Sequence, residues 1–162
     1  MKVRLATVDD IAFLARVSRE VQLAHAEALP QVFKQPGPDA FDERFFRGLL
    51  GDPDAVILIA ERDGEPVGFS RGSILREPET PIRHAWVRLH FKHIGVTGDE
   101  RGRGAGHALV AAGVRYAREH GIHTITGDVW SFNTRMLKFL AKERHVTFYE
   151  HQWLDVDAYD LE

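Results

Sequence analysis

Residues 96–109 read VTGDERGRGAGHAL, in which a strand-like exit is followed by a glycine at every second position from 102 to 106 and then by an alanine-rich segment. Glycine lets the backbone approach a ligand closely, and the first N–H groups of a helix have no partner within the helix. The N-terminal end of a helix therefore attracts anions. Arg101 and Arg103 add positive charge at the same place. The stretch predicts a binding site for a pyrophosphate group.

Two well-known phosphate-binding loops do not fit this stretch. A P-loop places Lys and then Ser or Thr after its last glycine, whereas His107 and Ala108 follow here. A dinucleotide-binding fingerprint follows the first strand of a parallel sheet, but a hairpin precedes this stretch and implies mixed strand directions. The alternative without a ligand is a glycine-rich surface turn with solvated arginines, and the strand-turn-helix context argues against it.

The surrounding segments alternate between strand-like and helix-like patterns. Residues 56–60 are all apolar, Asp63 and Gly64 are typical of a tight hairpin turn, and residues 86–96 alternate apolar and polar over most of their length. The expected strands cover residues 1–6, 56–60, a return from 66, 86–96, 122–129 and 146–156, and the expected helices cover residues 8–29, 41–50, 104–120 and 133–143. The predicted order is β-α-α-β-β-β-α-β-α-β, which indicates the α/β (α+β) class.

Composition limits both the size and the chemistry of the protein. Its 162 residues suit a single core, and no segment resembles an interdomain linker, so we expect one domain over residues 1–162. Hydrophobic residues make up 44% of the chain and charged residues 28%, which excludes a disordered or collagen-like protein. The chain contains no cysteine, which excludes disulfides, thiolate metal sites and cysteine nucleophiles, and favours a reducing compartment.

The charge and the N-terminal sequence bear on partners and location. A formal net charge of −3 at pH 7 lacks the basic excess that nonspecific nucleic-acid binding requires, so no nucleic-acid partner is expected. The opening MKVRLATVDDIAF carries two acidic residues where a secretory signal needs an apolar run, and no apolar stretch approaches membrane-spanning length. We expect a cytoplasmic protein with no membrane partner.

Arg101, Gly104 and Gly106, placed behind a strand that ends at Val96, resemble the acyl-CoA pyrophosphate loop of the GNAT superfamily of N-acetyltransferases. The likeness covers nearly the whole chain, from the Arg4-Leu5-Ala6-Thr7 opening with Asp10, through the hairpin at residues 60–69, to Trp130-Ser131-Phe132-Asn133. It implies a mixed, mostly antiparallel central sheet flanked by about four helices. It also implies that acetyl-CoA donates an acetyl group by direct attack of a primary amine on a small molecule, peptide or protein. Family members are often dimers.

The resemblance also assigns residues to the coenzyme. The strand before the loop would offer backbone hydrogen bonds to the pantetheine arm, and the loop amides would hold the pyrophosphate. Asn133, at the start of the next helix, would lie near the pantetheine, although an Asn there is equally typical of a helix cap. The residues assigned to the coenzyme are Ile94, Gly95, Val96, Arg101, Gly102, Arg103, Gly104, Ala105, Gly106 and Asn133.

Direct attack requires a neutral amine, whereas an alkylammonium group titrates near pKa 10.4, so a proton acceptor is expected. His93 precedes the strand end by three residues, where family members often place an acidic base, and it is the predicted catalytic residue. His90 competes with it, and a hydrogen-bonded sheet histidine without chemistry is the alternative for both. Residues three apart lie on opposite faces of a strand unless a bulge intervenes, so only one of the two is expected to face the cleft. For the same reason no metal site is expected.

Two further features concern the acceptor and the thiolate. In the family the first two helices wall the acceptor cleft, and His25 lies on the inward stripe of the first helix, so His25 is a candidate substrate contact. A histidine buried in the core is the alternative for His25. His90, on the strand before the loop, is the other candidate substrate contact. Relatives carry a Tyr seven residues after the helix-opening Asn as the acid for the departing thiolate. Here that position is Leu140. This departure supports a second hypothesis, a non-catalytic acyl-CoA-binding or regulatory module.

Overall fold

The computed structural model describes residues 1–156. The chain divides into two compact units, Met1–Asp128 and Val129–Glu162. Each unit is compact in its own right, so a single domain over residues 1–162 stays a prediction.

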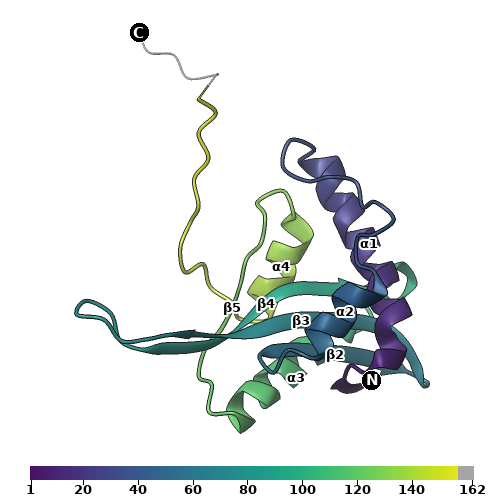
Figure 1. The fold of residues 1–162 in the computed structure, drawn as a ribbon, viewed down its shortest axis with the longest axis horizontal. Coiled ribbons are helices and arrows are strands. Elements are labelled where there is room, and N and C mark those ends of the chain that lie inside the picture. The colour runs from purple at the N-terminus through teal and green to yellow at the C-terminus, as the bar shows by residue number, and fades with distance from the viewer. Residues whose placement is uncertain (157–162) are drawn as a thin grey trace. The chain divides into compact units, whose positions relative to one another are not determined.

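The first unit is a five-stranded sheet with helices on both faces (Figure 1). The strands lie side by side in the order of the sequence; β1 to β4 pair antiparallel, and β5 pairs parallel with β4. The predicted mixed, mostly antiparallel sheet is therefore confirmed. The strands are β1 (Lys2–Leu5), β2 (Ala55–Arg62), β3 (Glu65–Glu77), β4 (Trp86–Val96) and β5 (Ile125–Gly127), and the helices are α1 (Ile11–Ala28), α2 (Glu43–Leu50) and α3 (Ala105–Glu119).

Asp63 and Gly64 form the turn between β2 and β3, as the sequence predicts. Their φ angles of 54° and 89° are both positive, as a type I′ hairpin turn requires at its two central residues. This turn type matches the right-handed twist of the paired strands. The local sequence therefore determines the hairpin at the centre of the sheet.

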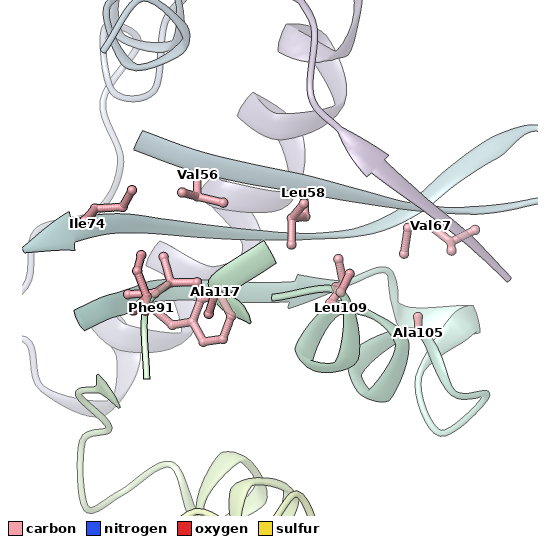
Figure 2. Close-up of a cluster of buried hydrophobic side chains, with 12 residues drawn as sticks. Val56, Leu58, Val67, Ile74, Phe91, Ala105, Leu109 and Ala117 are labelled. Atoms are coloured by element: carbon pink, nitrogen blue, oxygen red, sulfur yellow. The ribbon is translucent and has the colours of Figure 1, made fainter. Parts of the chain in front are cut away.

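Apolar residues of β2 point to both faces of the sheet. Val56, Leu58 and Ala60 belong to a buried cluster that includes residues of α3 (Figure 2). Ile57 and Ile59 belong to a second cluster, formed with α1 and α2 on the opposite face. Figure 1 shows the same layers, with α3 on one side of the sheet and α1 and α2 on the other. Burial on both faces explains why residues 56–60 are continuously apolar rather than alternating.

An ion cluster joins β1, β2 and the start of α1. Both terminal nitrogens of Arg4 donate to the carboxylate of Asp10, at 2.7 and 2.8 Å, and its Nε donates to Glu61 at 2.6 Å. The backbone N–H of Thr7 donates to Asp10 as well, which caps the short 3-10 helix η1 (Val8–Asp10) that leads into α1. Asp10 is only 4% exposed. A buried carboxylate with three donors is well compensated, so the cluster fixes the chain entry into α1.

The second unit contains helix α4 (Thr134–Lys142), and with it all four predicted helices are present. The strand predicted at residues 146–156 is wrong, because these residues form no strand and large side chains such as Val146 and Phe148 are exposed. Aromatic and β-branched residues favour strands, but a strand also needs a neighbour to pair its backbone groups. The observed order therefore ends at β5 and α4. No helix among the described residues has the length and apolar character needed to cross a membrane.

Replacing Asp10 with Asn should lower the free energy of unfolding at pH 7 by about 2–3 kcal/mol, because the buried hydrogen bonds from the Arg4 guanidinium to residue 10 are weakened. The hydrogen bond from Arg4, more than any other cause, holds the pKa of Asp10 below its ordinary value. Its stabilising contribution is thus present above about pH 4 and is lost as pH falls through the lower folded pKa. Denaturant unfolding at several pH values should show the difference from the parent shrinking below about pH 4. The exposed neighbour provides the control, Asp9→Asn, and a D10N protein as stable as D9N at pH 7 would contradict the prediction.

Candidate functional site

The turn between β4 and α3 ends in a helix start that no side chain caps. Gly104 is the N-cap of α3, with φ of 93°, and Gly102 has φ of 79°, both in the left-handed region. Asp42 caps α2 by accepting from the Phe45 amide, but α3 has no side-chain cap. The first amides of α3, beginning at Ala105, are therefore directed at a site that an anionic ligand can occupy.

The carboxylate of Glu100 holds this turn in place. Glu100 ends the 3-10 helix η2 (Gly98–Glu100) and is 6% exposed. It accepts from Arg62 Nε at 2.7 Å and from Arg103 Nη1 at 2.8 Å. Arg62 also donates to the Arg103 carbonyl at 2.9 Å. The charge of Arg103 is therefore used to order the turn, whereas Arg101 is exposed and donates only its Nε, to the carbonyl of Val96 at 3.1 Å.

The strand that leads into the turn extends beyond its last pair with β5. The pairs between β4 and β5 end at Phe91 with Gly127, where β5 ends, while β4 continues to Val96. The coenzyme residues predicted on this strand, Ile94 to Val96, pair with β3 and lie beyond the last pair with β5. Their backbone therefore has a strand partner on one side alone among the described residues, just before the turn.

Gly95 has a packing role that the sequence does not reveal. A Cβ atom at this position would lie 2.8 Å from Val17 and 3.0 Å from Phe69. These two side chains belong to the cluster between the sheet and α1. Gly95 is therefore required for α1 to lie close to β4, independently of any ligand.

A bulge brings both candidate histidines to one face of the sheet. His90 pairs with Ser73 and His93 pairs with Arg71, and the register shifts between these pairs at Lys92. Ser73 and Arg71 are two residues apart on β3, so their partners share a face. The expectation that only one of the two histidines faces the cleft is therefore wrong.

The sequence carries a signal for this bulge. The apolar positions of β4 are odd-numbered at Leu89 and Phe91 and even-numbered at Ile94 and Val96, and all four side chains pack in the same cluster. A change of phase within an alternating strand indicates one inserted residue. Lys92 is that residue, and it is exposed.

His93 is half-buried and accepts a hydrogen bond from Arg71. Nη2 of Arg71 lies 2.7 Å from Nδ1 of His93. A guanidinium has only N–H donors, so Nδ1 is the acceptor and the neutral imidazole carries its hydrogen on Nε2. Burial, followed by the charges of Arg71, His25 and Lys92, lowers the pKa of His93 to about 4. His93 is therefore neutral at pH 7, with its lone pair directed at Arg71.

The other two histidines have different surroundings. His25, on α1, lies near enough to His93 for a charge on His25 to lower the pKa of His93. Nδ1 of His25 donates to the Val21 carbonyl at 2.8 Å, and the His25 ring packs against Phe33. Nδ1 of His90 lies 2.9 Å from the Thr126 hydroxyl of β5. Burial, partly offset by Asp128, lowers the pKa of His90. The structure thus places His25 within electrostatic range of His93 and ties His90 to β5.

The sequence did not identify three residues that shape the site. Arg62 and Glu100 order the turn, and Arg71 lies against His93. The sequence pattern gives no sign that Glu100 is buried, because it stands among charged residues in an apparent surface turn. Arg71 stands between Ser70 and Gly72 on β3, and only the pairing with β4 places it beside His93.

In the second unit, Asn133 caps α4 by accepting from the Met136 amide at 3.1 Å. The capping alternative is thereby observed, and the coenzyme role stays a prediction. Leu140 is half-buried on α4 and has no proton to donate. Within residues 1–156, no three His, Cys, Asp or Glu side chains are placed to hold a metal ion.

Comparisons with known proteins relate the chain to acetyltransferases. Residues 20–145 match the Acetyltransferase (GNAT) family. No curated protein matches the sequence. A tetramutant of the BH1408 protein from Bacillus halodurans is similar in structure, with a TM-score of 0.90, 22% identity, and coverage of 96% of this chain and 100% of that one.

Two other solved structures carry acetyltransferase names. A predicted acetyltransferase with acetyl-CoA from Clostridium acetobutylicum has a TM-score of 0.69 and 20% identity, covering 98% of this chain and 97% of that one. A ribosomal-protein-alanine N-acetyltransferase from Brucella melitensis biovar Abortus 2308 has a TM-score of 0.68 and 21% identity, covering 96% and 99%. At these identities the similarity establishes the fold.

The low pKa of His93 should be measurable in the stability of the protein. Unfolded His93 binds a proton near pH 6.5 and folded His93 only near pH 4, so unfolding takes up a proton between these values and stability falls as pH falls. The loss should reach up to about 3 kcal/mol by pH 4. His93→Asn should remove most of this slope in denaturant unfolding between pH 7 and 4.5. The exposed control, His123→Asn, should keep the parental slope, and equal slopes in all three proteins would contradict the prediction.

Proposed function

The chain belongs to the acetyltransferase (GNAT) family, and from this premise we propose that it transfers an acetyl group from acetyl-CoA to a primary amine of a small molecule, peptide or protein. The observation that carries the proposal is the uncapped N-terminus of α3, in a turn that buried Glu100 orders and that follows the part of β4 beyond its last pair with β5. Amides and a helix dipole can neutralise a pyrophosphate without a basic protein surface. This agrees with a net charge of −3.

The coenzyme would bind along β4 and the turn. The backbone of Ile94, Gly95 and Val96 would bond the pantetheine arm, and the amides from Arg101 to Gly106 would bond the two phosphates. Both arginines of the turn are exposed, but Arg103 is paired with Glu100, whereas Arg101 is in no ion pair within residues 1–156 and would add charge. Asn133 would contact the pantetheine through its side-chain NH2 group, because its side-chain oxygen accepts from the Met136 amide.

The proposed reaction is direct attack of a neutral amine on the thioester carbon. A C–N bond forms, the C–S bond breaks, and the thiolate leaves while the nitrogen loses a proton. We propose His93 as the residue beside this centre. In the structure its Nδ1 accepts from Arg71 and its Nε2 carries hydrogen, so it donates a hydrogen bond as it stands. It can accept the proton of the amine only after Arg71 leaves Nδ1. His25 and His90 are proposed contacts of the acceptor.

A non-catalytic acyl-CoA-binding module is the second candidate, and Leu140 is the observation that favours it. No hydroxyl stands there to protonate the thiolate. A thiol pKa near 8.5 makes thiolate a tolerable leaving group without an acid, so we place catalysis first. We propose the cytoplasm as the compartment because the chain has no cysteine, and we propose no nucleic-acid or membrane partner.

Substitutions at Gly104 and Gly106 distinguish a loss of coenzyme binding from a loss of stability. Gly106 lies within α3 and has no positive φ, so a Leu is compatible with its backbone conformation, and in Gly106→Leu the new side chain should obstruct the amides. We expect acetyl-CoA affinity, measured by calorimetry, to fall by about tenfold or more, which is 1.4 kcal/mol or more. Gly104→Ala should instead lower stability by about 1–2 kcal/mol, because Gly104 is left-handed.

Helical Gly48 provides the matched control, since it has open space around its Cβ position and lies on α2. Gly48→Leu should bind acetyl-CoA as the parent does. With the parent, release of free thiol from acetyl-CoA in the presence of a panel of primary amines distinguishes the two functions. Thiol release supports transfer; thermal stabilisation by acetyl-CoA without any thiol release supports the binding module. Parental affinity in Gly106→Leu would place the phosphates elsewhere.

We also propose a homodimer, because residues 146–156 expose large apolar side chains. These are Val146, Phe148, Tyr149, Trp153, Leu154 and Val156, each at least 60% exposed. A cluster of large exposed apolar side chains along one segment is typical of an interaction site, and we propose a second copy of this chain as the partner.

Light scattering should give the parent twice the 18.4 kDa mass of one chain. The double variant Phe148→Ser/Trp153→Ser should shift towards the mass of one chain. Ile82→Ser removes a side chain that is 91% exposed in the β3–β4 connection, and it should remain dimeric. A monomeric parent would overturn the proposal.

A further inference from the structure

Arg71 is a half-buried cation for which the described chain provides no carboxylate. Arg4, Arg62, Arg76, Arg88 and Arg103 all form ion pairs with Asp or Glu, and none of the ion pairs within residues 1–156 includes Arg71. Burial lowers its pKa, and no neighbouring charge offsets this effect. A buried cation normally has an anionic partner, because desolvation of the charge is costly.

The neighbours of Arg71 are neutral and leave part of its guanidinium available. One nitrogen, Nη2, bonds the lone pair of His93, and the guanidinium carbon lies 5.6 Å from the centre of the Phe45 ring. A guanidinium has five N–H donors in a planar fork that matches a carboxylate. The bond to His93 uses one of these donors. Phe45 is 38% exposed, so this guanidinium lies beneath an aromatic ring at an accessible surface.

The position of Arg71 suits the acceptor rather than the coenzyme. Arg71 pairs with His93 on β4, whereas the turn follows Val96, which pairs with Gly68. Three residues of strand, roughly 10 Å, separate these pairs. The part of acetyl-CoA that follows the phosphates along β4, the pantetheine arm and the thioester, is uncharged. An anion at Arg71 would therefore come from the other substrate.

We propose that the acceptor carries a carboxylate on the same small molecule as its amine, as an amino acid does, and that Arg71 binds this carboxylate. The inference rests on the proposed acetyl transfer and specifies its substrate class. Arg71 is thus a specificity-determining residue, and the ring of Phe45 covers the guanidinium on one side.

A carboxylate at Arg71 would also change the state of His93. The charged groups that act on His93 are Arg71 on β3, His25 on α1 and Lys92 on β4, and all of them disfavour its protonated form. A bound carboxylate would pair with the N–H donors that His93 leaves unused and neutralise the charge of Arg71. The protonated form of His93 would then be less disfavoured, and a turn of the guanidinium towards the carboxylate would release the Nδ1 lone pair to accept the amine proton. Binding of the correct acceptor and activation of the base are thereby coupled.

The test compares amines that differ only in the carboxylate. The probes are glycine, β-alanine and 4-aminobutyrate, with their primary amides, and tyramine as an amine without a carboxylate. With acetyl-CoA and the full-length parent, at least one acid should exceed its amide in kcat/KM by about tenfold. Arg71→Met should reduce this preference to within about twofold and Arg71→Lys should retain part of it. Arg76→Met, on the same strand, is the control and should keep the parental preference.

A binding measurement does not depend on turnover. The N-acetylated acids and amides should be titrated, in the presence of coenzyme A, while NMR follows the ring protons of His93. The acids should raise the pKa of His93 from about 4 towards 6.5, and the amides should leave it unchanged. Equal effects of acid and amide would overturn the inference, even if Arg71→Met fails to fold.

The remaining outcomes separate this inference from the proposed function. Acetyl transfer to tyramine or to the amides, with no preference for the acids, would overturn the proposal that the acceptor carries a carboxylate. It would leave the proposed acetyl transfer intact. A parent that binds no acetyl-CoA overturns the proposed function, and the inference with it. Binding of acids that Arg71→Met leaves unchanged shows that another residue holds the carboxylate, which also overturns the assignment.

Discussion

The buried carboxylate of Glu100 orders the turn on which the proposed coenzyme site depends. Two guanidiniums, from Arg62 on β2 and Arg103 in the turn itself, donate to it, and Arg62 also bonds the Arg103 carbonyl. These bonds fasten the turn to the sheet while its glycines take left-handed conformations and leave α3 uncapped. Amides that are held in place before a ligand arrives bind an anion with little cost of reorganisation. The proposed anion site thus depends on a cation–carboxylate cluster within the same turn.

A second constraint acts at the bulge of β4, eight residues before Glu100. The inserted Lys92 changes which residues face α1 and α2, so that His93 meets Arg71 and His90 shares its face. Without the bulge, His93 would point to the α3 side among apolar residues. The bulge lies on β4, and the turn follows the end of β4. The same strand therefore positions both the proposed phosphate site and the proposed reaction centre. The close approach of α1 to this strand, over Gly95, completes that face.

Much of this arrangement follows from local sequence, and the rest depends on contacts between distant segments. The hairpin at Asp63 and Gly64 and the glycine turn into α3 are encoded by neighbouring residues, and both were predicted. The burial of Glu100 and the contact of Arg71 with His93 depend on residues 38 and 22 positions away, which no local pattern reveals. The strand predicted at residues 146–156 failed for the same reason, because propensity does not supply a pairing partner.

The backbone amides from Arg101 to Gly106 are proposed to bind the phosphates of the coenzyme. A titration of uniformly ¹⁵N-labelled protein with coenzyme A, followed by amide chemical shifts, tests this binding residue by residue. The largest changes should fall on the amides of residues 101–106, together with those of residues 94–96 along β4. Saturable binding with the largest changes elsewhere, or no change at any concentration, would contradict the proposal.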